Sequence, residues 1–260
     1  MKKQLSLALA AVAVIGASGL ARATTVNLSA WTYGDSWGHV VDVVGRNNPA
    51  ASDHGAAGGF MGSVTFNGNG GPFSGTIDPF MTYCVELTQD FYLPSGNMKN
   101  YKVVGGSAYA EWNNANGSGL SSMQVANRLG QLMSYADGRI ANADQSTALQ
   151  LAIWNVIYNN VDSVTDAASI FYDRNVVSDP TNFYDRYANE LLAGSLGWNQ
   201  QYTMYVLTSP TTQDFLLTDG LNHARGDSAG AGIRDVPEPA SLALVALALG
   251  AAAATRRRRA

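Results

Sequence analysis

The sequence predicts one α+β domain, a mainly antiparallel β-sheet or sandwich with a helical insert, placed between two targeting segments. Hydrophobic residues make up 46% of the 260 residues and charged residues only 14%. This composition provides enough apolar surface for a core and excludes an ordinary disordered chain. The 27 glycines are typical of a loop-rich β protein. Short alternating segments come first, helical periodicity follows in the middle, and alternating segments return at the end.

The first part of the body predicts β-strands separated by turn-forming residues. A strand is expected to begin within residues 24–45, where apolar side chains alternate loosely. Residues 46–58 are small and polar and predict a loop, and the Asn- and Gly-rich residues 67–72 predict a tight turn. Further strands are expected at residues 59–66, 73–77, 80–87 and 101–104.

The middle of the body changes to helical periodicity. Apolar residues recur at helical spacing over 121–135. The segment 144–158 is apolar almost all round, which predicts a buried helix. Asp179 and Pro180 form a good start for a third helix that runs to about residue 193. Strands are then expected at 201–207 and 215–218. The body spans 24–225, and 226–235 is a small-residue linker.

The N-terminus has the pattern of a secretory signal peptide. Lys2 and Lys3 precede an apolar run over 5–15, and small residues lead to Ala21-Arg22-Ala23. This is the order of charged region, apolar region and A-x-A cleavage site that signal peptidase recognises. We expect residues 1–23 to be removed after Ala23, because the apolar run is too short for a permanent membrane anchor.

The C-terminus predicts a weak membrane tether. Pro237, Glu238 and Pro239 are followed by an apolar run over 242–254 and then by four consecutive arginines. A helix over 240–254 would span about 22 Å, whereas the hydrocarbon core of a bilayer is about 30 Å thick. The terminal arginines would hold that end in the cytoplasm, so the body is expected to be exported and transiently anchored at the inner membrane.

The same segment, 236–260, resembles the PEP-CTERM sorting signal, which consists of a Pro-Glu-Pro motif, a short transmembrane run and a basic tail. The resemblance implies a Gram-negative bacterium that makes extracellular polysaccharide. It also implies processing near the motif by an exosortase-type sorting peptidase, with release to the cell surface or the extracellular matrix. A biofilm component is the kind of protein that such a signal serves.

Cys84 is the only cysteine, so no internal disulfide can form. Successive side chains of a strand point to opposite faces. Thr82, Cys84 and Glu86 are therefore expected on the more polar face of the strand, and Tyr83 and Val85 on its core face. A lone cysteine in an exported protein is a candidate reactive thiol. The alternative is a small packed residue without reactivity.

Gln150 is the one strongly polar side chain in the apolar stretch 148–154. A buried amide costs free energy unless its polar atoms find partners. It either hydrogen-bonds to a neighbouring loop backbone or offers its side-chain carbonyl as a reaction partner.

Together, these two segments resemble the thioester domain of bacterial surface adhesins. Tyr83-Cys84-Val85 matches the cysteine motif of that family. Gln150-Leu151-Ala152-Ile153-Trp154 matches its glutamine motif, with Leu149 where the family has threonine. The resemblance implies an internal thioester between Cys84 and Gln150, which an amine or hydroxyl on a surface or matrix polymer then attacks. Such a protein is a single-use covalent binder, not an enzyme that turns over, and it needs no cofactor.

Four further residues are candidates for a supporting role. Tyr83 and Trp154 would keep water away from the thioester. Glu86 and His39 are candidates for proton transfer, although Glu86 is more simply explained as a solvated strand residue and His39 as a loop residue.

Several classes of function are disfavoured. Seven of the 16 Lys and Arg residues lie in the two ends, so the body is strongly acidic and would repel nucleic acid. The sequence has no Ser-His-Asp signature, phosphate-binding loop or metal-ligand pattern. The main alternative is a structural or carbohydrate-binding matrix protein with an inert cysteine, and a hydrolase is a weaker one. Aromatic residues that could line a sugar-binding face are Trp31, Tyr33, Trp37, Tyr109 and Trp112.

Overall fold

The computed structural model describes residues 24–33, 38–47, 53–67, 73–94, 96–174 and 182–219. The predicted signal peptide, the linker and the sorting segment lie outside these residues, as do Ala21, Ala23 and the Pro237-Glu238-Pro239 motif. No helix in the described ranges is long and apolar enough to span a membrane, and the predicted transmembrane run over 242–254 falls beyond them.

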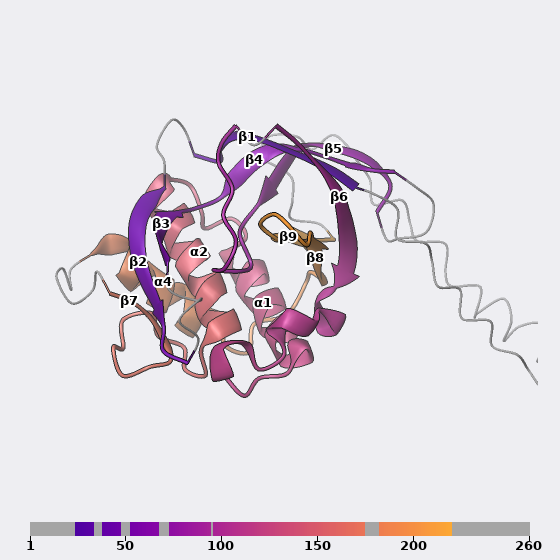
Figure 1. The fold of residues 1–260 in the computed structure, drawn as a ribbon. Helices are drawn as coiled ribbons and strands as arrows, with labels where there is room; N and C mark the ends of the chain where they lie inside the picture. The colour runs from indigo at the N-terminus through magenta and orange to yellow at the C-terminus, as the bar shows by residue number, and fades with distance from the viewer. Residues whose placement is uncertain are drawn as a thin grey trace, which may run out of the picture.

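The main sheet is antiparallel and has six strands in the order β5-β4-β1-β6-β8-β9 (Figure 1). β1 is central and begins at Thr24, the first residue after the predicted cleavage site. Its side chains Val26 and Leu28 are fully buried. The strands are β1 (Thr24–Trp31), β4 (Phe60–Phe66), β5 (Gly75–Thr82), β6 (Gly96–Gly105), β8 (Met204–Thr208) and β9 (Phe215–Thr218).

The two outer strands of this sheet almost meet, which gives it the form of a nearly closed barrel. Immediately after β5, the chain pairs with β9 through an isolated antiparallel bridge between Cys84 and Phe215. The Thr82 hydroxyl also donates a hydrogen bond of 2.6 Å to the carbonyl of Leu216. The predicted reactive cysteine therefore lies where the barrel closes.

A second sheet contains three short strands in the order β3-β2-β7. They are β2 (His39–Gly45), β3 (Asp53–Ala57) and β7 (Phe171–Asp173). The prediction of a loop throughout 46–58 is wrong, because β3 pairs with β2 along its whole length. Its small residues carry little strand propensity of their own, and the partner strand determines their conformation.

In the described residues, three α-helices lie between β6 and β8 in sequence. They are α1 (Ser122–Ala136), α2 (Ala143–Tyr158) and α4 (Phe183–Ser195). The first two confirm the helical periodicity, and each begins with a side-chain cap, from Ser121 and Asn142 respectively. The third begins after the N-cap Asn182, whereas the predicted start at Asp179 and Pro180 lies outside the described residues.

α2 is the central helix of the molecule. It packs against α1, α4 and the second sheet (Figure 1). Every residue from Ser146 to Tyr158 is buried, which confirms the prediction of a buried helix. A polar side chain on this helix must therefore find its hydrogen-bond partners inside the protein.

Other strand predictions are correct in type and differ in their bounds. The predicted strands 73–77 and 80–87 are one strand, β5, which ends at Thr82. β6 begins earlier than predicted, and β7 was not predicted because three residues give no readable period.

Candidate functional site

The residues on either side of Cys84 are hydrogen-bonded to β9, whereas the N–H and C=O of Cys84 itself are not. The amide of Leu216 donates to the carbonyl of Tyr83 at 2.9 Å, and the amide of Val85 donates to the carbonyl of Asp214 at 3.2 Å. These two bonds flank the Cys84–Phe215 bridge. In such a pair, the N–H and C=O of the bridged residue point away from the partner strand. Cys84 therefore turns both groups toward the interior.

The side-chain amide of Gln150 binds both of these groups. The amide nitrogen of Cys84 donates to Gln150 Oε1 at 2.9 Å, and Gln150 Nε2 donates to the Cys84 carbonyl at 2.9 Å. Gln150 is 1% exposed and Cys84 7% exposed. The structure thus brings together the two residues of the predicted thioester, which are 66 positions apart in sequence.

Both faces of the Cys84 segment are buried, so the prediction that only the face of Tyr83 and Val85 meets the core is wrong. Thr82, Cys84 and Glu86 are as inaccessible as Tyr83 and Val85 on the other face. Alternation correctly separates the two sets of side chains but does not show that each face is covered. Cys84 belongs to the main hydrophobic core.

Hydroxyl groups in the first turn of α2 fix the helix that carries Gln150. Ser146 accepts a hydrogen bond of 2.7 Å from the amide of Gly59. Thr147 donates to the carbonyl of Ala57 at 2.9 Å and accepts from the amide of His39. Leu149, which replaces the family's threonine, is buried in the core. The anchoring hydroxyls of this helix therefore come from Ser146 and Thr147.

Tyr83 and Trp154 are both buried beside the site. The Tyr83 hydroxyl lies 3.5 Å from Ser146 Oγ, and burial raises the pKa of this phenol well above its ordinary value. Trp154 is 4% exposed and lies one helical turn after Gln150. Its indole nitrogen is buried without a hydrogen-bond partner among the described residues.

A pocket of about 350 Å³ opens beside Cys84. Cys84, Glu86 and Trp154 all contribute to its wall, so Glu86 does face the same space as the thiol. Four of its ten other lining residues are aromatic, acidic and amide groups lie between them, and none of the described lining residues is a lysine or arginine. The remaining lining residues are Trp31, Gly55, Ala56, Phe60, Gln89, Asp90, Phe91, Tyr92, Leu93 and Gln213.

His39 is the first residue of β2 and lies beside the first turns of α2. It does not line this pocket. Its ring contacts the Asp144 carboxylate and stacks on Tyr184. Asp144 precedes Gln150 by six residues, which is about 9 Å along a helix. The geometry gives His39 a role in joining β2 to α2, and proton transfer by His39 stays a prediction.

Among the described residues, the aromatic side chains considered for a sugar-binding face lie in separate contacts and do not gather on one face. Trp112 and Tyr109 are buried in the core and contact each other edge to face. Trp31 packs on Phe60. Tyr33 donates to the carbonyl of Ile140, and Trp37 lies outside the described residues.

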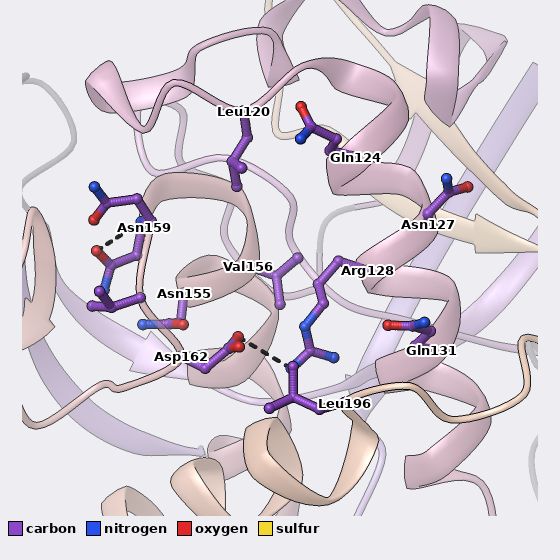
Figure 2. A pocket seen from close by; sticks show the side chains of 12 residues that line it. Leu120, Gln124, Asn127, Arg128, Gln131, Asn155, Val156, Asn159, Asp162 and Leu196 are labelled. Atoms are coloured by element: carbon purple, nitrogen blue, oxygen red, sulfur yellow. Dashed lines mark hydrogen bonds and ion pairs between the residues drawn. The ribbon is translucent and has the colours of Figure 1, made fainter.

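A second pocket, of about 360 Å³, lies between α1, α2 and the segment after α2 (Figure 2). Its walls carry many side-chain amides and one ion pair, Arg128 with Asp162 at 3.1 Å. Asn155 Oδ1 is buried there without a hydrogen-bond partner among the described residues. The amide residues are Gln124, Asn127, Gln131, Asn155, Asn159 and Asn160. No sequence motif indicates this pocket, because its residues are spread over three segments.

A comparison with protein families finds the PEP-CTERM protein-sorting motif at residues 235–259. Comparisons with curated proteins and with solved structures find no match. The matched motif is the recognition signal for exosortase-type processing. It points to an exported protein that is sorted to the surface through its C-terminus. The chain thus carries the sorting motif predicted from Pro237, Glu238 and Pro239.

Proposed function

We propose that this exported protein forms an internal thioester between Cys84 and Gln150 and uses it once, to attach covalently to an amine or hydroxyl on a surface or matrix polymer. The observation that carries the proposal is the pair of hydrogen bonds between the Gln150 amide and the Cys84 main chain. The resemblance of both sequence motifs to adhesin thioester domains supports it independently.

The direction of the Cys84 side chain suits an attack on Gln150. The carboxamide spans the N–H and C=O of Cys84, so it lies close to the plane of the local strand pairing. A side chain leaves a strand roughly perpendicular to that plane. In the proposal, Sγ turns toward a face of the carboxamide, which is the side from which a nucleophile approaches a carbonyl carbon.

Thioester formation needs only the atoms of these two residues. Sγ bonds to the side-chain carbonyl carbon of Gln150, the bond from that carbon to Nε2 breaks, and the thiol proton leaves with the nitrogen as ammonia. The Cys84 N–H donates to Oε1, where negative charge develops in the tetrahedral intermediate. A preorganised donor at that position lowers the barrier, as in an oxyanion hole.

The amine or hydroxyl of the partner then opens the thioester. This group bonds to the same carbonyl carbon, the carbon–sulfur bond breaks, and the nucleophile's proton passes to the sulfur. The products are an amide or ester on residue 150 and a free thiol on Cys84. The aromatic pocket beside Cys84 gives the nucleophile a route, while the burial of both residues limits attack by water.

The sorting motif indicates where the covalent attachment would take place. A Gram-negative cell that exports this protein and processes it near the motif would release the body among surface and matrix polymers. A single-use covalent bond suits attachment there, because the product stays attached without further energy input.

The test is the intact mass of the mature protein, purified without denaturant, before and after treatment with methylamine. We expect a mass below the calculated value by one ammonia. Methylamine should abolish this deficit, and the product should carry methylamide on residue 150 and one alkylatable thiol. Peptide mapping locates both changes.

Two variants and one control sharpen this test. Cys84→Ala and Gln150→Glu should both show the full calculated mass. Gln131→Glu changes a glutamine in the other pocket and should keep the deficit. A wild-type mass equal to the calculated value, together with rapid alkylation of Cys84 in the folded protein, would rule out covalent capture.

A second candidate function, non-covalent carbohydrate binding, is favoured by the amide-lined pocket. Side-chain amides and an Arg–Asp pair are suitable partners for sugar hydroxyls. Calorimetric titration with the exopolysaccharide of the source organism tests it. Asn127→Ala combined with Gln131→Ala should weaken such binding, and equal binding by the variant would exclude this pocket.

A further inference from the structure

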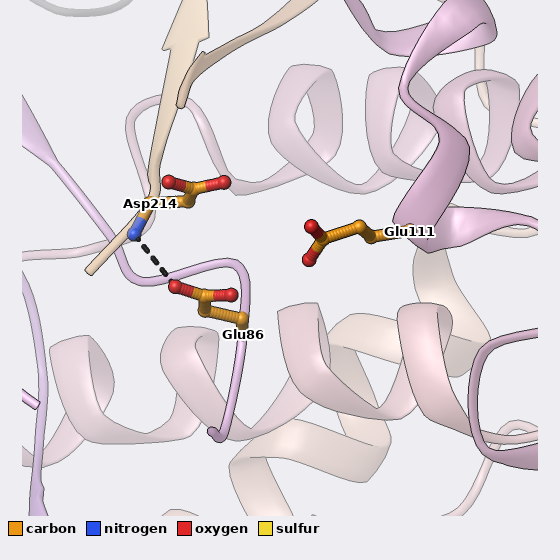
Figure 3. Close-up of side chains that lie close together, drawn as sticks. All are labelled: Glu86, Glu111 and Asp214. Atoms are coloured by element: carbon orange, nitrogen blue, oxygen red, sulfur yellow. Dashed lines mark hydrogen bonds between the residues drawn. The ribbon is translucent and has the colours of Figure 1, made fainter. Parts of the chain in front are cut away.

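Three carboxylates that no sequence motif connects meet close to the Cys84 segment (Figure 3). Glu86 follows β5, Glu111 lies in the short 3-10 helix η3 (Ala110–Trp112), and Asp214 precedes β9. One oxygen of each lies within 4.8 Å of the others. We call these three residues the carboxylate cluster.

Neighbouring groups hold the cluster in place but do not neutralise it. The amide of Asp214 donates to Glu86 Oε1 at 3.1 Å, and the amide of Ser209 donates to Asp214 Oδ1 at 2.6 Å. The Tyr109 hydroxyl lies between two members, 2.6 Å from Asp214 Oδ2 and 3.2 Å from Glu111 Oε2, and can give its single proton to only one of them at a time. All these donors are uncharged.

Glu86 provides a second, separate observation. This residue is 3% exposed, and its Oε2 is buried without a hydrogen-bond donor among the described residues. Figure 3 shows one carboxylate oxygen of Glu86 held by the Asp214 amide and the other on the side of Glu111. A buried carboxylate oxygen without a donor is costly and rare.

No cationic side chain in the described ranges compensates this charge. The ion pairs found there join His39 to Asp144, Arg128 to Asp162 and Arg174 to Asp42, and none reaches the cluster. Three carboxylates this close together, two of them buried, therefore favour a positive occupant.

We propose that the carboxylate cluster binds one divalent cation of the calcium class. Its ligand atoms are all oxygens, which hard cations prefer, and it offers no imidazole nitrogen. Ca²⁺ accepts irregular oxygen geometry and completes its coordination with water. Glu111 is exposed and leaves room for such water. Extracellular calcium sites typically bind at about 10⁻⁴ to 10⁻³ M, which suits an exported protein.

The proposed cation would join three segments at the closure of the barrel. Glu86 is two residues after Cys84, and Asp214 is adjacent to Phe215, the bridge partner of Cys84. Cation binding would stiffen the main chain that holds Gln150. The proposal stands apart from the thioester, because the cluster and the free Glu86 oxygen are present whether or not that bond forms.

The test uses the mature protein, freed of metal with a chelator, and titrates it separately with CaCl₂ and MgCl₂ at neutral pH. Isothermal calorimetry should show one saturable calcium site, and the thermal unfolding midpoint should rise with calcium concentration. Glu111→Gln, an exposed substitution, should weaken calcium binding by at least about tenfold. Glu190→Gln, on the exposed face of α4, is the matched control and should bind as the wild type does.

Two further variants separate this proposal from its alternatives. Glu86→Gln should fold and lose the calcium response. Cys84→Ala should keep the response, which shows that calcium binding and the thioester are independent. If calcium neither binds the wild type nor shifts its unfolding, the positive occupant is a proton shared between Glu86 and Asp214, and the proposal is wrong. Equal calcium affinity in Glu111→Gln would also overturn it.

Discussion

The Cys84 main chain and the Glu86 carboxylate are both buried and lie two residues apart where the barrel closes. They differ in whether the protein supplies all of their hydrogen-bond partners. The Cys84 main chain has both of its leftover groups bonded by one side chain, Gln150. Glu86 has one oxygen bonded and one without a donor in the described structure. The described residues therefore supply every hydrogen-bond partner of the Cys84 main chain, but they supply none for the second oxygen of Glu86.

The difference indicates whether each site finds its partner inside the protein or in solution. In the proposed thioester, nucleophile and electrophile both belong to the protein, so the first reaction would be internal and would need no outside component. At the carboxylate cluster, the negative charge has no cationic partner among the described residues, so in our proposal the balance comes from solution. Substitutions that remove one contact at a time can test this distinction.

Gln150→Leu should have the largest effect. It prevents the cross-link, worth about 4 kcal/mol, and leaves the buried N–H of Cys84 without an acceptor, at about 1–3 kcal/mol. The donor to the Cys84 carbonyl, Gln150 Nε2, has already left as ammonia in the thioester form and adds nothing to this loss. We expect the free energy of unfolding to fall by about 6 kcal/mol. Guanidinium unfolding followed by circular dichroism measures it.

The matched control for this substitution is Gln213→Leu. Gln213 is also buried and donates to the carbonyls of Glu86 and Asp214, but it has no part in the proposed bond. We expect a loss of about 2 kcal/mol. Equal losses in the two variants would contradict the special place of Gln150.

Cys84→Ala should have the next largest effect, because it removes the cross-link and keeps the hydrogen bonds. By analogy with a disulfide that closes a loop of this length, the loss is about 4 kcal/mol. Without a thioester, only a small side chain is lost, at about 1 kcal/mol. Denaturant unfolding of wild type and variant, both under reducing conditions, distinguishes the two values.

The sequence was sufficient to find the two residues of the site but not their geometry. Cys84 stands out as the only cysteine and Gln150 as a polar residue in an apolar helix, and local periodicity correctly placed Gln150 on a buried helix. Which groups of Cys84 remain unbonded depends on its bridge to Phe215. That pairing is set by the closure of the barrel, and no local pattern reports it.

The errors in the fold prediction have the same origin. Alternation along the Cys84 segment suggested that Cys84 lies on a polar face away from the core, but helix α2 and the walls of the pocket cover that face. β3 has little intrinsic strand preference and forms because β2 is beside it. The carboxylate cluster joins residues from three distant segments, so only the tertiary structure brings it into view.

Ser146→Ala should have a moderate effect, since it acts on the helix that presents Gln150. The amide of Gly59 would lose its acceptor in a buried position, at a cost of about 2 kcal/mol. Ser29→Ala, at an exposed serine in β1, should change stability by no more than about 0.5 kcal/mol. Mass spectrometry of the Ser146 variant should also show a smaller fraction of thioester. An unchanged fraction would mean that this anchor does not position Gln150.

Ala56→Trp should have the smallest effect on stability and a clear effect on reactivity. Ala56 is exposed in β3 and lines the pocket beside Cys84. A tryptophan is well tolerated in a strand, so we expect the free energy of unfolding to change by no more than about 0.5 kcal/mol. The larger side chain should narrow the route to the thioester and slow the methylamine reaction several-fold. Ala193→Trp, on the exposed side of α4, should leave that rate unchanged. If both variants react at the wild-type rate, the nucleophile does not enter through this pocket, and the aromatic walls serve only to keep the core closed.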